Sequence, residues 1–519
     1  MPRPAVNPWL VAVAVMSSAV MEVLDTSVVN VSLPHIAGSL ASTVDQATWV
    51  LTSYLVANAI ILPITGWLSN HIGRKRLLLT VVSGFTLSSL LCGLAPNLPF
   101  LILCRILQGT TGGGLQPLSQ AVLLEEFPPE RRGTAMAVWG MGIVVMPILG
   151  PIVGGWITDN YTWRWVFFIN LPIGIMSLVL IHLFIYDPSY IRRRSQSIDF
   201  WGLGLLAVWV AALQIMLDKG QQDDWFGSRF IVFLALTAGV GLVAFVLREL
   251  WTREPIVHLR LLTYRTYATG VGLIAVLGLV LYGGLVVLPL FMQEMLGYDA
   301  STAGLLTSPR GLGTLVLMPV AGFLLGRRFD SRKMMTVGMV VAGVSLLGFA
   351  RMTLDVPNAY VAWVGIIQGA GMGLLFVPLT TTTMDPIPLS EMGFATSIYS
   401  LTRNLGGSIG IAFATTLLAR RAQFHQNVLV AHLTPSSPAY QHMLQQAQAL
   451  LARHGLNPAN TGPASLGLLY RLLLQQANYA SYMDVFWVFG WIFIVAIPLL
   501  WLMKKPRTGG KRASAAAAH

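Results

Sequence analysis

Residues 101–124 read LILCRILQGTTGGGLQPLSQAVLL, and residues 359–381 read AYVAWVGIIQGAGMGLLFVPLTT. Both stretches are apolar, and each is long enough to cross a membrane as a helix, which takes about 20 residues. Both contain a Gln-Gly pair followed by Pro-Leu, and the offset from Gln108 to Gln368 is 260 residues. The two stretches therefore predict two membrane helices that are equivalent members of an internal repeat.

The repeat continues outside these two stretches. Gly66-Trp67-Leu68 returns 256 residues later as Gly322-Phe323-Leu324, and a basic cluster follows each copy. A constant offset with the same direction across the membrane predicts a parallel repeat of six helices. The expected fold is an all-α membrane protein with two six-helix bundles and two inserted helices. The expected divisions are an N-terminal bundle at 1–190, the insert at 191–265, a C-terminal bundle at 266–505 and a cytoplasmic tail at 506–519. The C-terminal bundle includes an outer loop at about 423–480, which holds an amphipathic helix at 437–455. Part of the tail resembles a tag remnant.

The composition agrees with a membrane protein. Of the 519 residues, 55% are hydrophobic and 10% are charged, whereas soluble domains carry about 25% charged residues. Only helices and closed barrels satisfy the backbone in lipid, and the long continuous apolar runs indicate helices. Fourteen spans are predicted, at 9–33, 48–69, 77–95, 101–124, 134–157, 165–186, 200–217, 229–250, 268–291, 302–325, 334–352, 359–381, 393–418 and 484–503.

The placement of basic residues predicts the orientation of these spans. The formal net charge is +12, and 22 Lys and Arg residues lie at the two termini and in the loops after even-numbered spans, against 8 in the opposite loops. The positive-inside rule then puts both termini in the cytoplasm. The expected location is the inner membrane of a bacterium, and the charge indicates anionic lipid headgroups rather than nucleic acid as the partner.

Motifs of enzymatic chemistry are absent from the sequence. It contains neither the phosphate-binding pattern G-x-x-x-x-G-K-[ST] nor the metal-binding pattern H-E-x-x-H. The two cysteines, Cys92 and Cys104, lie in apolar stretches and imply no disulfide framework. We therefore expect a transporter and not an enzyme, with no cofactor and no metal, that is energised by an ion gradient.

Charged residues inside predicted spans are the first candidates for function, because inserting one costs about 2.5–3.5 kcal/mol. Glu22 and Asp25 lie three residues apart in the first span and therefore share a helix face. Arg105 enters the fourth span at a similar depth. A carboxylate near an arginine can bind and release a proton as its access to water changes. The alternative interpretation is a structural ion pair that holds the two helices together.

Further polar residues in the spans are candidates for the wall of a substrate cavity. Arg310 in the tenth span and Arg403 in the thirteenth could face such a cavity or bind a counter-charge. The alternative for both is a side chain that reaches toward the headgroups or bonds a neighbouring helix. The uncharged candidates are Asn30, Asn58 and Gln116.

Small residues and prolines mark candidate moving parts. After the second span, Gly66, Gly73 and Arg74 are candidates for a gating latch, and a solvated charge run is the alternative. Glycine lets helices approach closely and proline bends them, so a tightly packed fifth span can act as a pivot or a seal. The residues concerned in the fifth span are Pro147, Gly150, Pro151, Gly154 and Gly155.

Taken together, these motifs resemble the major facilitator superfamily, within it the fourteen-span drug:proton antiporters, and most nearly the Emr-type multidrug efflux permeases. The resemblance rests on LDTSVVNVSLP at 24–34, on 66–76, on RILQG at 105–109, on 147–155, on WRWVFFINLPIG at 163–174 and on LDKG with DWF at 217–226. It implies proton coupling through Asp25 and proton transfer involving Arg105. It also implies a gating role for the 66–76 segment.

The chain departs from the pattern of that family at two positions. Asn70 stands where the family usually has Asp, so the charge thought to latch one conformation is missing. Glu22 is an extra carboxylate, which could serve cationic substrates or add a second titrating site. The long loop before the last span is similar to that of the Emr permeases, so the resemblance implies a periplasmic adaptor and an outer-membrane channel as partners.

The expected function is proton-coupled export of lipophilic drugs or toxic compounds. Fold alone does not fix substrate or direction, so a secondary transporter for a single metabolite is the alternative. Broad sensitivity of cells that lack the protein would favour the first, and a single nutrient defect would favour the second.

Overall fold

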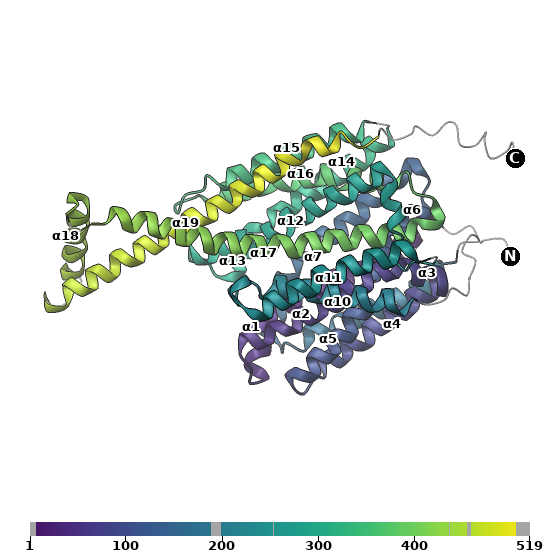
Figure 1. Cartoon of the computed structure of the whole chain (residues 1–519), viewed down its shortest axis with the longest axis horizontal. Helices are drawn as coiled ribbons and strands as arrows, with labels where there is room; N and C mark the ends of the chain where they lie inside the picture. Colours follow the sequence, from purple (N-terminus) through teal and green to yellow (C-terminus); the bar gives the residue numbers. More distant parts are fainter. Residues whose placement is uncertain are drawn as a thin grey trace.

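The computed structural model of the chain describes residues 7–187, 199–252, 254–327, 329–434, 436–453 and 458–504. These residues form helices joined by short turns, with no strand among them. The helices run side by side in one elongated bundle, and helical segments project beyond one of its ends (Figure 1). The all-α fold predicted from the sequence is confirmed. The predicted tail at 506–519 and the first part of the predicted insert, 191–198, lie outside the described residues.

The segment that we call the N-terminal half runs from α1 to α9. Its elements are α1 (Pro8–Ser39), α2 (Val44–Ile61), the 3-10 turn η1 (Leu62–Ile64), α3 (Thr65–Ile72), α4 (Arg74–Gly93), α5 (Leu98–Gly112), α6 (Leu115–Glu126), α7 (Pro129–Asn160), α8 (Trp165–Phe168) and α9 (Asn170–Phe184). Side-chain caps mark several starts: the Thr43 hydroxyl accepts from the Gln46 amide before α2, and the Asn97 side chain accepts from the Phe100 amide before α5.

The insert and the C-terminal half follow. The insert consists of α10 (Phe200–Lys219), η2 (Trp225–Gly227), α11 (Arg229–Trp251) and η3 (Leu259–Thr263). The C-terminal half consists of α12 (Arg265–Glu294), α13 (Ala300–Thr307), α14 (Pro309–Gly326), α15 (Ser331–Phe349), α16 (Asn358–Met384), η4 (Leu389–Glu391), α17 (Met392–His432), α18 (Pro438–Arg453) and α19 (Pro458–Leu500).

Twelve helical stretches in the described part of the chain are long and apolar enough to cross a membrane. The predicted spans at 101–124 and 393–418 are not among them, so the count of fourteen is not confirmed. The first of these is divided at Gly113 and Gly114 into α5 and α6, each too short to cross alone. The second lies in α17, whose 41 residues include polar and charged side chains along its length.

The two halves repeat one helix contact. Gly109 of α5 faces the carbonyl oxygen of Tyr54 on α2, and a Cβ at this glycine would overlap that oxygen. Gly369 of α16 faces the carbonyl oxygen of Arg310 on α14 in the same way. The glycines are 260 residues apart and their partners 256. The packing therefore follows the repeat that the sequence indicates.

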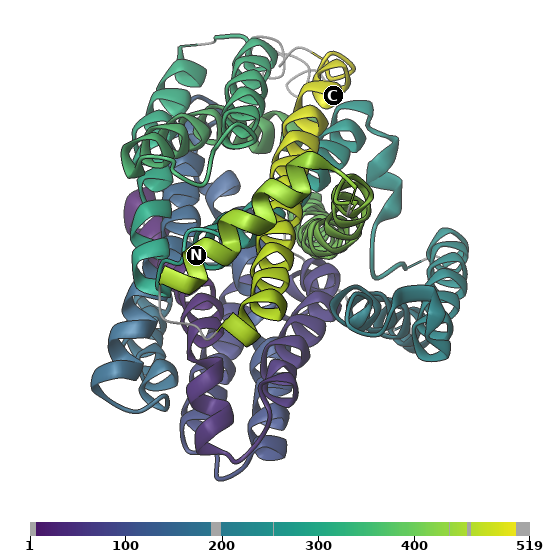
Figure 2. The ribbon, with the colours of Figure 1, turned by 90° about the vertical axis from the view of Figure 1, so that its left-hand side faces the viewer.

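The two inserted helices form a hairpin that packs beside the bundle, against α2 and α17 (Figure 2). At the tip of the hairpin the Thr52 hydroxyl of α2 donates to the Asp218 carboxylate at 2.5 Å. The Trp225 indole N–H donates to the Thr416 hydroxyl of α17 at 3.0 Å. The insert thus contacts both halves of the protein.

The segment predicted as a loop at about 423–480 is helical over most of its length. α17 continues to His432, α19 begins at Pro458, and α18 lies across the far end of the projecting arm (Figure 1). The predicted amphipathic helix at 437–455 is observed as α18, and its last two positions lie outside the described residues. At the base of the arm the Asp484 carboxylate bonds Arg421 at 2.5 Å and His425 at 2.7 Å.

The halves meet tightly at the end of the bundle that carries the start of α1 and the end of α19 (Figure 1). A Cβ on Gly66 of α3 would lie 2.6 Å from the backbone nitrogen of Phe394 on α17. A Cβ on Gly133 of α7 would lie 3.1 Å from the carbonyl oxygen of Gly322 on α14. We call these two glycine contacts the terminal-end seal. Larger side chains at Gly66 or Gly322 would force the halves apart.

Candidate functional site

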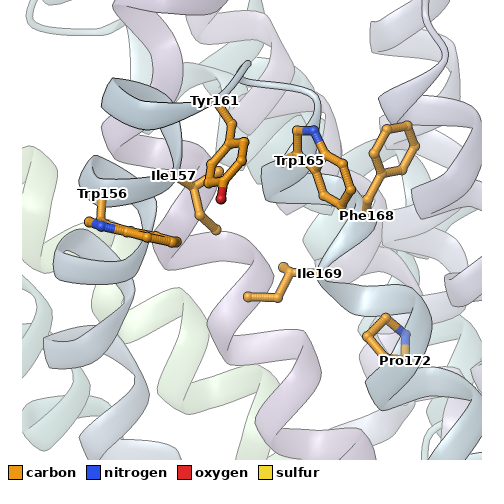
Figure 3. Close-up of a pocket in the computed structure, with 7 residues that line it drawn as sticks. All are labelled: Trp156, Ile157, Tyr161, Trp165, Phe168, Ile169 and Pro172. Atoms are coloured by element: carbon orange, nitrogen blue, oxygen red, sulfur yellow. The ribbon is translucent and has the colours of Figure 1, made fainter.

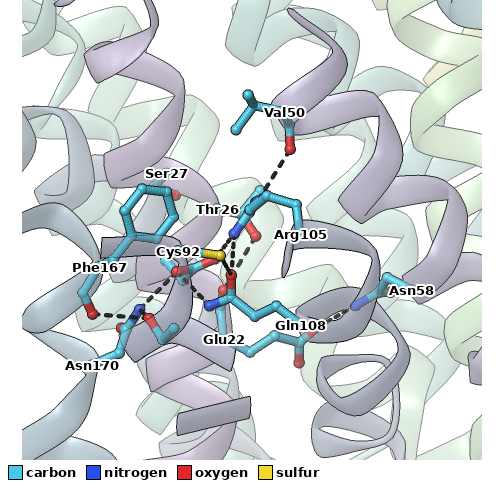
Figure 4. A network of polar contacts seen from close by, with 12 residues as sticks. Glu22, Thr26, Ser27, Val50, Asn58, Cys92, Arg105, Gln108, Phe167 and Asn170 are labelled. Carbon is cyan, nitrogen blue, oxygen red and sulfur yellow. Dashed lines mark hydrogen bonds and ion pairs between the residues drawn. The ribbon is translucent and has the colours of Figure 1, made fainter. Parts of the chain in front are cut away.

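Asp25 of α1 and Arg105 of α5 form a fully buried ion pair. Both side chains have no exposed surface, and Arg105 Nη1 donates to Asp25 Oδ2 at 2.6 Å. Figure 4 shows the arginine at the centre of a network of polar contacts between α1, α2, α5 and α9. A charge-assisted hydrogen bond of this length is strong, and removing either partner would leave a buried charge uncompensated.

Two amides complete the surroundings of the Asp25 carboxylate. Gln108 Nε2 donates to Asp25 Oδ1 at 3.0 Å, and Asn170 Nδ2 donates to the same oxygen at 2.7 Å. The Asn170 amide also donates to the Ser89 hydroxyl at 3.0 Å. The carboxylate thus accepts from three side chains on two helices, α5 and α9.

The Arg105 side chain is itself held in position. Its Nε donates to the Val50 carbonyl oxygen at 3.1 Å, and its Nη1 also donates to Gln108 Oε1 at 2.7 Å. The guanidinium lies 4.1 Å from the centroid of the Tyr54 ring, within cation–π range. Its Nη2 has no partner in the structure and can therefore serve a water molecule or another acceptor.

Glu22 lies one helical turn before Asp25 and has an incomplete set of partners. Asn58 Nδ2 of α2 donates to Glu22 Oε1 at 2.9 Å, while Oε2 is buried without a partner. The Arg403 charge and the hydrogen-bonding Gln116 side chain lie near this carboxylate. An unsatisfied buried carboxylate oxygen is costly, and a proton or a cationic group would remove that cost.

Arg403 of α17 reaches from the C-terminal half into this region. Its Nη2 donates to Gln116 Oε1 of α6, so a side-chain hydrogen bond joins the two halves beside Glu22. Arg403 is 2% exposed, and its Nε is buried without a partner. The predicted residues Glu22, Asn58, Gln116 and Arg403 therefore form one polar cluster.

Two predicted site residues lie outside this cluster. Asn30 is exposed on α1, and it follows Asp25 along the helix, whereas Glu22 precedes Asp25. Arg310 is buried on α14, where its backbone packs against α16 at Gly365 and Gly369. The structure therefore brings together Asp25 with Arg105, and Glu22 with Asn58, Gln116 and Arg403, but not Asn30 or Arg310.

Sequence reasoning missed several contacts of Asp25 and Arg105. In the sequence Gln108 marks the repeat and carries no predicted contact with Asp25, although it lies three residues after Arg105 and so on the same helix face. Asn170 lies in the family stretch at 163–174, which was its only signal. Tyr54 and Ser89 had no signal in the sequence, because their role depends on how α2 and α4 pack on α5 and α9.

Two of the three predicted latch residues, Gly73 and Arg74, lie at the turn between α3 and α4, while Gly66 lies in the first turn of α3. Gly73 has φ +95, a conformation that favours glycine, and its chain turns toward the Asp187 carboxylate. The Lys75 backbone N–H donates to that carboxylate at 2.9 Å. Arg74 is buried and paired with Glu125 at the end of α6. Carboxylates thus reach this turn from Asp187 and from Glu125 at the end of α6.

The predicted pivot residues of the fifth span lie in one unbroken helix, α7, although it contains Pro147 and Pro151. Gly150 packs against Ser27 of α1, and Gly154 packs against the Val28 carbonyl oxygen, 3.0 Å from where a Cβ would lie. A Cβ at Gly155 would meet nothing within 4 Å. Close packing of α1 on α7 therefore depends on two of the three glycines.

An apolar pocket of about 420 Å³ opens between the end of α7 and the α8–α9 segment (Figure 3). Its lining residues are Trp156, Ile157, Tyr161, Trp165, Phe168, Ile169 and Pro172. Trp156, Tyr161 and Trp165 are each more than half exposed. Exposed aromatic side chains gathered at a helix end are typical of a membrane–water interface. The pocket shares no residue with the polar network around Asp25.

Comparison with known proteins gives the family. The Major Facilitator Superfamily matches residues 15–411. The fatty acid resistance protein FarB of Neisseria gonorrhoeae is 38% identical over 493 residues, which cover 94% of this chain and 95% of FarB. The multidrug export protein EmrB of Haemophilus influenzae is 38% identical over 499 residues, 96% of each chain. EmrB of Escherichia coli K12 is 36% identical over 502 residues, again 96% of each chain.

Solved structures agree in fold at low sequence identity. The human organic anion transporter MFSD10 (TETRAN) superposes with a TM-score of 0.61 at 13% identity, over 96% of this chain and 100% of that one. The proton:xylose symporter XylE superposes with a TM-score of 0.58 at 14% identity, over 96% of both chains. The predicted resemblance to Emr-type permeases is confirmed by the relatives, and the multi-pass fold by the structures. This chain is a membrane transporter and not an enzyme, and it belongs to the major facilitator superfamily.

Proposed function

We propose that this transporter exports lipophilic drugs or other toxic compounds across the bacterial inner membrane, and that Asp25 and Arg105 couple export to proton entry. The relatives named as multidrug export and fatty acid resistance proteins support the first part. The buried Asp25–Arg105 pair supports the second and is the observation that carries the proposal. The energy source is then the proton gradient, with no cofactor.

The chemistry of the pair supports the proposal of proton coupling. A proton that binds an Asp25 oxygen cancels the charge that Arg105 compensates and turns one acceptor into a donor. Arg105 Nη1 and the two amides then lose a charged acceptor, and the contacts between α1, α5 and α9 weaken together. Loss of that proton restores them. Glu22, one turn away and incompletely bonded, is the second candidate for proton or cation binding.

We further propose fourteen membrane crossings with both termini in the cytoplasm. α5 and α6 together run from Leu98 to Glu126 and supply one crossing, and the first part of α17 supplies another. The excess of Lys and Arg on the side of the termini supports this orientation. In this orientation the terminal-end seal would lie at the cytoplasmic side and close the transporter to the cytoplasm.

The arm formed by the end of α17, α18 and the start of α19 would then stand in the periplasm. It extends beyond the bundle, where a soluble partner can reach it (Figure 1). A periplasmic adaptor connected to an outer-membrane channel is the partner that we propose for this arm. The lipid bilayer and lipophilic small molecules are the other partners.

The test is substrate-triggered proton flux in liposomes that contain a pH-sensitive dye and an imposed pH gradient. Wild type, Asp25→Asn and Glu22→Gln are compared, with Asp355→Asn as the control because Asp355 lies exposed in the α15–α16 loop. We expect flux in wild type and in the control, and loss of flux in Asp25→Asn. Equal flux in Asp25→Asn and wild type would remove Asp25 from the coupling path and point to Glu22.

A transporter for a single metabolite remains the alternative on this fold. It predicts flux with one compound class only, and normal tolerance of unrelated toxic compounds in cells that lack the protein. Flux triggered by chemically unrelated lipophilic compounds would rule it out.

A further inference from the structure

The helix crossing around Arg310 is the counterpart of the crossing that carries the proton pair. In the N-terminal half α5 crosses α2 where Gly109 faces the Tyr54 carbonyl. In the C-terminal half α16 crosses α14 where Gly369 faces the Arg310 carbonyl. Arg310 therefore occupies the position of Tyr54, the ring on which the Arg105 guanidinium lies.

The other residues of the two crossings can then be compared. With the offset of 260 residues between α5 and α16, Gly365 takes the position of Arg105 and Gln368 takes the position of Gln108. A Cβ at Gly365 would lie 3.7 Å from the Arg310 backbone nitrogen, so this glycine adds no side chain to the crossing. The crossing in the C-terminal half thus also contains one arginine and one glutamine. Its arginine, however, lies on α14, whereas Arg105 lies on α5, the counterpart of α16.

The carboxylate has no counterpart in the C-terminal half. α12 takes the place of α1 in the repeat, and between Arg265 and Gln293 it contains no Asp or Glu; its single carboxylate, Glu294, is its last residue. In the N-terminal half the carboxylate of Asp25 is the acceptor for both Arg105 and Gln108. α12 therefore supplies no carboxylate to the corresponding donor groups at the second crossing.

Arg310 is unpaired in the structure. Among the buried arginines and lysines of the described ranges, it alone makes no hydrogen bond and no ion pair. It is 6% exposed and its Nε is buried without a partner, and the Gln368 side chain makes no hydrogen bond either, which leaves its Nε2 as an available donor. An unpaired charge in a protein interior within a membrane is costly, and such a group marks a place where a counter-charge binds.

We infer that the α14–α16 crossing binds the carboxylate of a lipophilic acid, with Arg310 as the cation and the Gln368 amide as a second donor. This inference rests on the proposed export of lipophilic compounds and names one class of substrate for it. The bound carboxylate would supply the acceptor that Asp25 supplies in the other half. The apolar part of the acid would lie along the spans of the C-terminal half.

The test is equilibrium binding to the full-length protein in lipid nanodiscs, measured by scintillation proximity, with empty nanodiscs subtracted. Two labelled probes share a twelve-carbon chain and differ in the head: dodecanoate and dodecyltrimethylammonium. The variants are Arg310→Gln, Arg310→Lys and Gln368→Leu. Arg327→Gln is the control, because Arg327 lies exposed at the end of the same helix and loses the same charge.

We expect Arg310→Gln to weaken dodecanoate binding at least tenfold, or about 1.4 kcal/mol. Arg310→Lys should weaken it less, Gln368→Leu should weaken it measurably, and the control should match wild type. Binding of dodecyltrimethylammonium should not weaken in any of them. If Arg310→Gln fails to fold, Arg310→Lys and Gln368→Leu still test the site.

Four outcomes would overturn the inference. Dodecanoate bound equally by wild type and Arg310→Gln would show that Arg310 does not hold the carboxylate. Equal weakening of both probes would show a structural role. Wild type that binds only the cationic probe would reject the carboxylate site while the proposed export of lipophilic compounds stands, whereas wild type that binds neither probe would count against both.

Discussion

The His258 ring stacks on the Phe394 ring, with centroids 3.9 Å apart and planes 7° apart, and the backbone of the same Phe394 is the surface on which Gly66 packs. His258 belongs to the linker between α11 and α12, Phe394 to α17, and Gly66 to α3. One ring pair therefore connects the inserted hairpin to the terminal-end seal.

This stack predicts a dependence of stability on pH. Burial lowers the pKa of His258 from its ordinary value of 6.5, and Arg260 lowers it further. A folded-state pKa below the unfolded one means that the stabilisation is complete above about pH 6.5 and is lost as the pH falls. For wild type in detergent, we expect the thermal unfolding temperature to decrease as the pH is lowered below about 6.5. In His258→Phe, which keeps a stacked ring, we expect the contribution of His258 to this decrease to be absent.

The control for this measurement is His35→Phe, because His35 is exposed on α1 and a change there keeps the His258 stack. It should retain the full pH dependence of wild type. A His258→Phe profile that coincides with those of wild type and the control would mean that His258 does not carry the effect.

The packing of α1 on α7 predicts opposite results for two neighbouring glycines. A Cβ at Gly150 would overlap the Ser27 side chain, whereas a Cβ at Gly155 would meet nothing within 4 Å. Overpacking of this kind costs about 1–3 kcal/mol, while alanine in a helix is favoured over glycine by up to about 1 kcal/mol. We expect Gly150→Ala to lower the unfolding midpoint and the transport rate, and Gly155→Ala to leave the midpoint unchanged or raise it. The same loss in both variants would contradict this packing.

The sequence was sufficient to identify the charged residues of the site, because inserting a charge into a membrane span is costly. Asp25 and Arg105 are charged residues in apolar spans, and such residues seldom occur there without a partner. The same argument identified Glu22, Arg310 and Arg403. It could not tell which of these charges would meet, because depth in the membrane is readable from sequence position but the rotation of each helix is not.

Neutral partners were harder to predict than charged ones. Gln108 and Asn170 contact Asp25 only because α5 and α9 turn their amides toward α1. The division of the fourth span at Gly113 also depends on neighbouring helices, because glycine permits a turn without requiring one. The helical continuation of α17 beyond the predicted span depends on its neighbours as well. Contacts between the inserted hairpin and the two halves had no signal apart from the family stretch at 217–226.

Asn170 provides a test of the amides around Asp25. Asn170→Leu keeps a similar volume and removes the donor to Asp25 Oδ1 at 2.7 Å and to the Ser89 hydroxyl at 3.0 Å. A hydrogen bond to a charged group contributes about 1.5–3 kcal/mol, so we expect substrate-triggered proton flux in liposomes to fall about tenfold or more. Asn160→Leu, at the exposed end of α7, is the matched control and should keep wild-type flux. Equal flux in the two variants would argue against a role for Asn170 in coupling.

The last prediction concerns the bridge from the inserted hairpin to the C-terminal half. The Trp225 indole donates to the Thr416 hydroxyl at 3.0 Å, while the Asp218 carboxylate accepts from Thr52 of the N-terminal half at 2.5 Å. A net hydrogen bond contributes about 0.5–1.5 kcal/mol, and a double-mutant cycle isolates it from the loss of other contacts. We expect Trp225→Phe and Thr416→Val each to lower the free energy of unfolding in mixed micelles, and their combination to lower it by less than the sum. A control cycle combines Thr416→Val with Trp201→Phe, because Trp201 is exposed on α10. In this cycle the two losses of unfolding free energy should add. Additive effects in the Trp225 cycle would mean that the hairpin contacts α17 there without stabilising it.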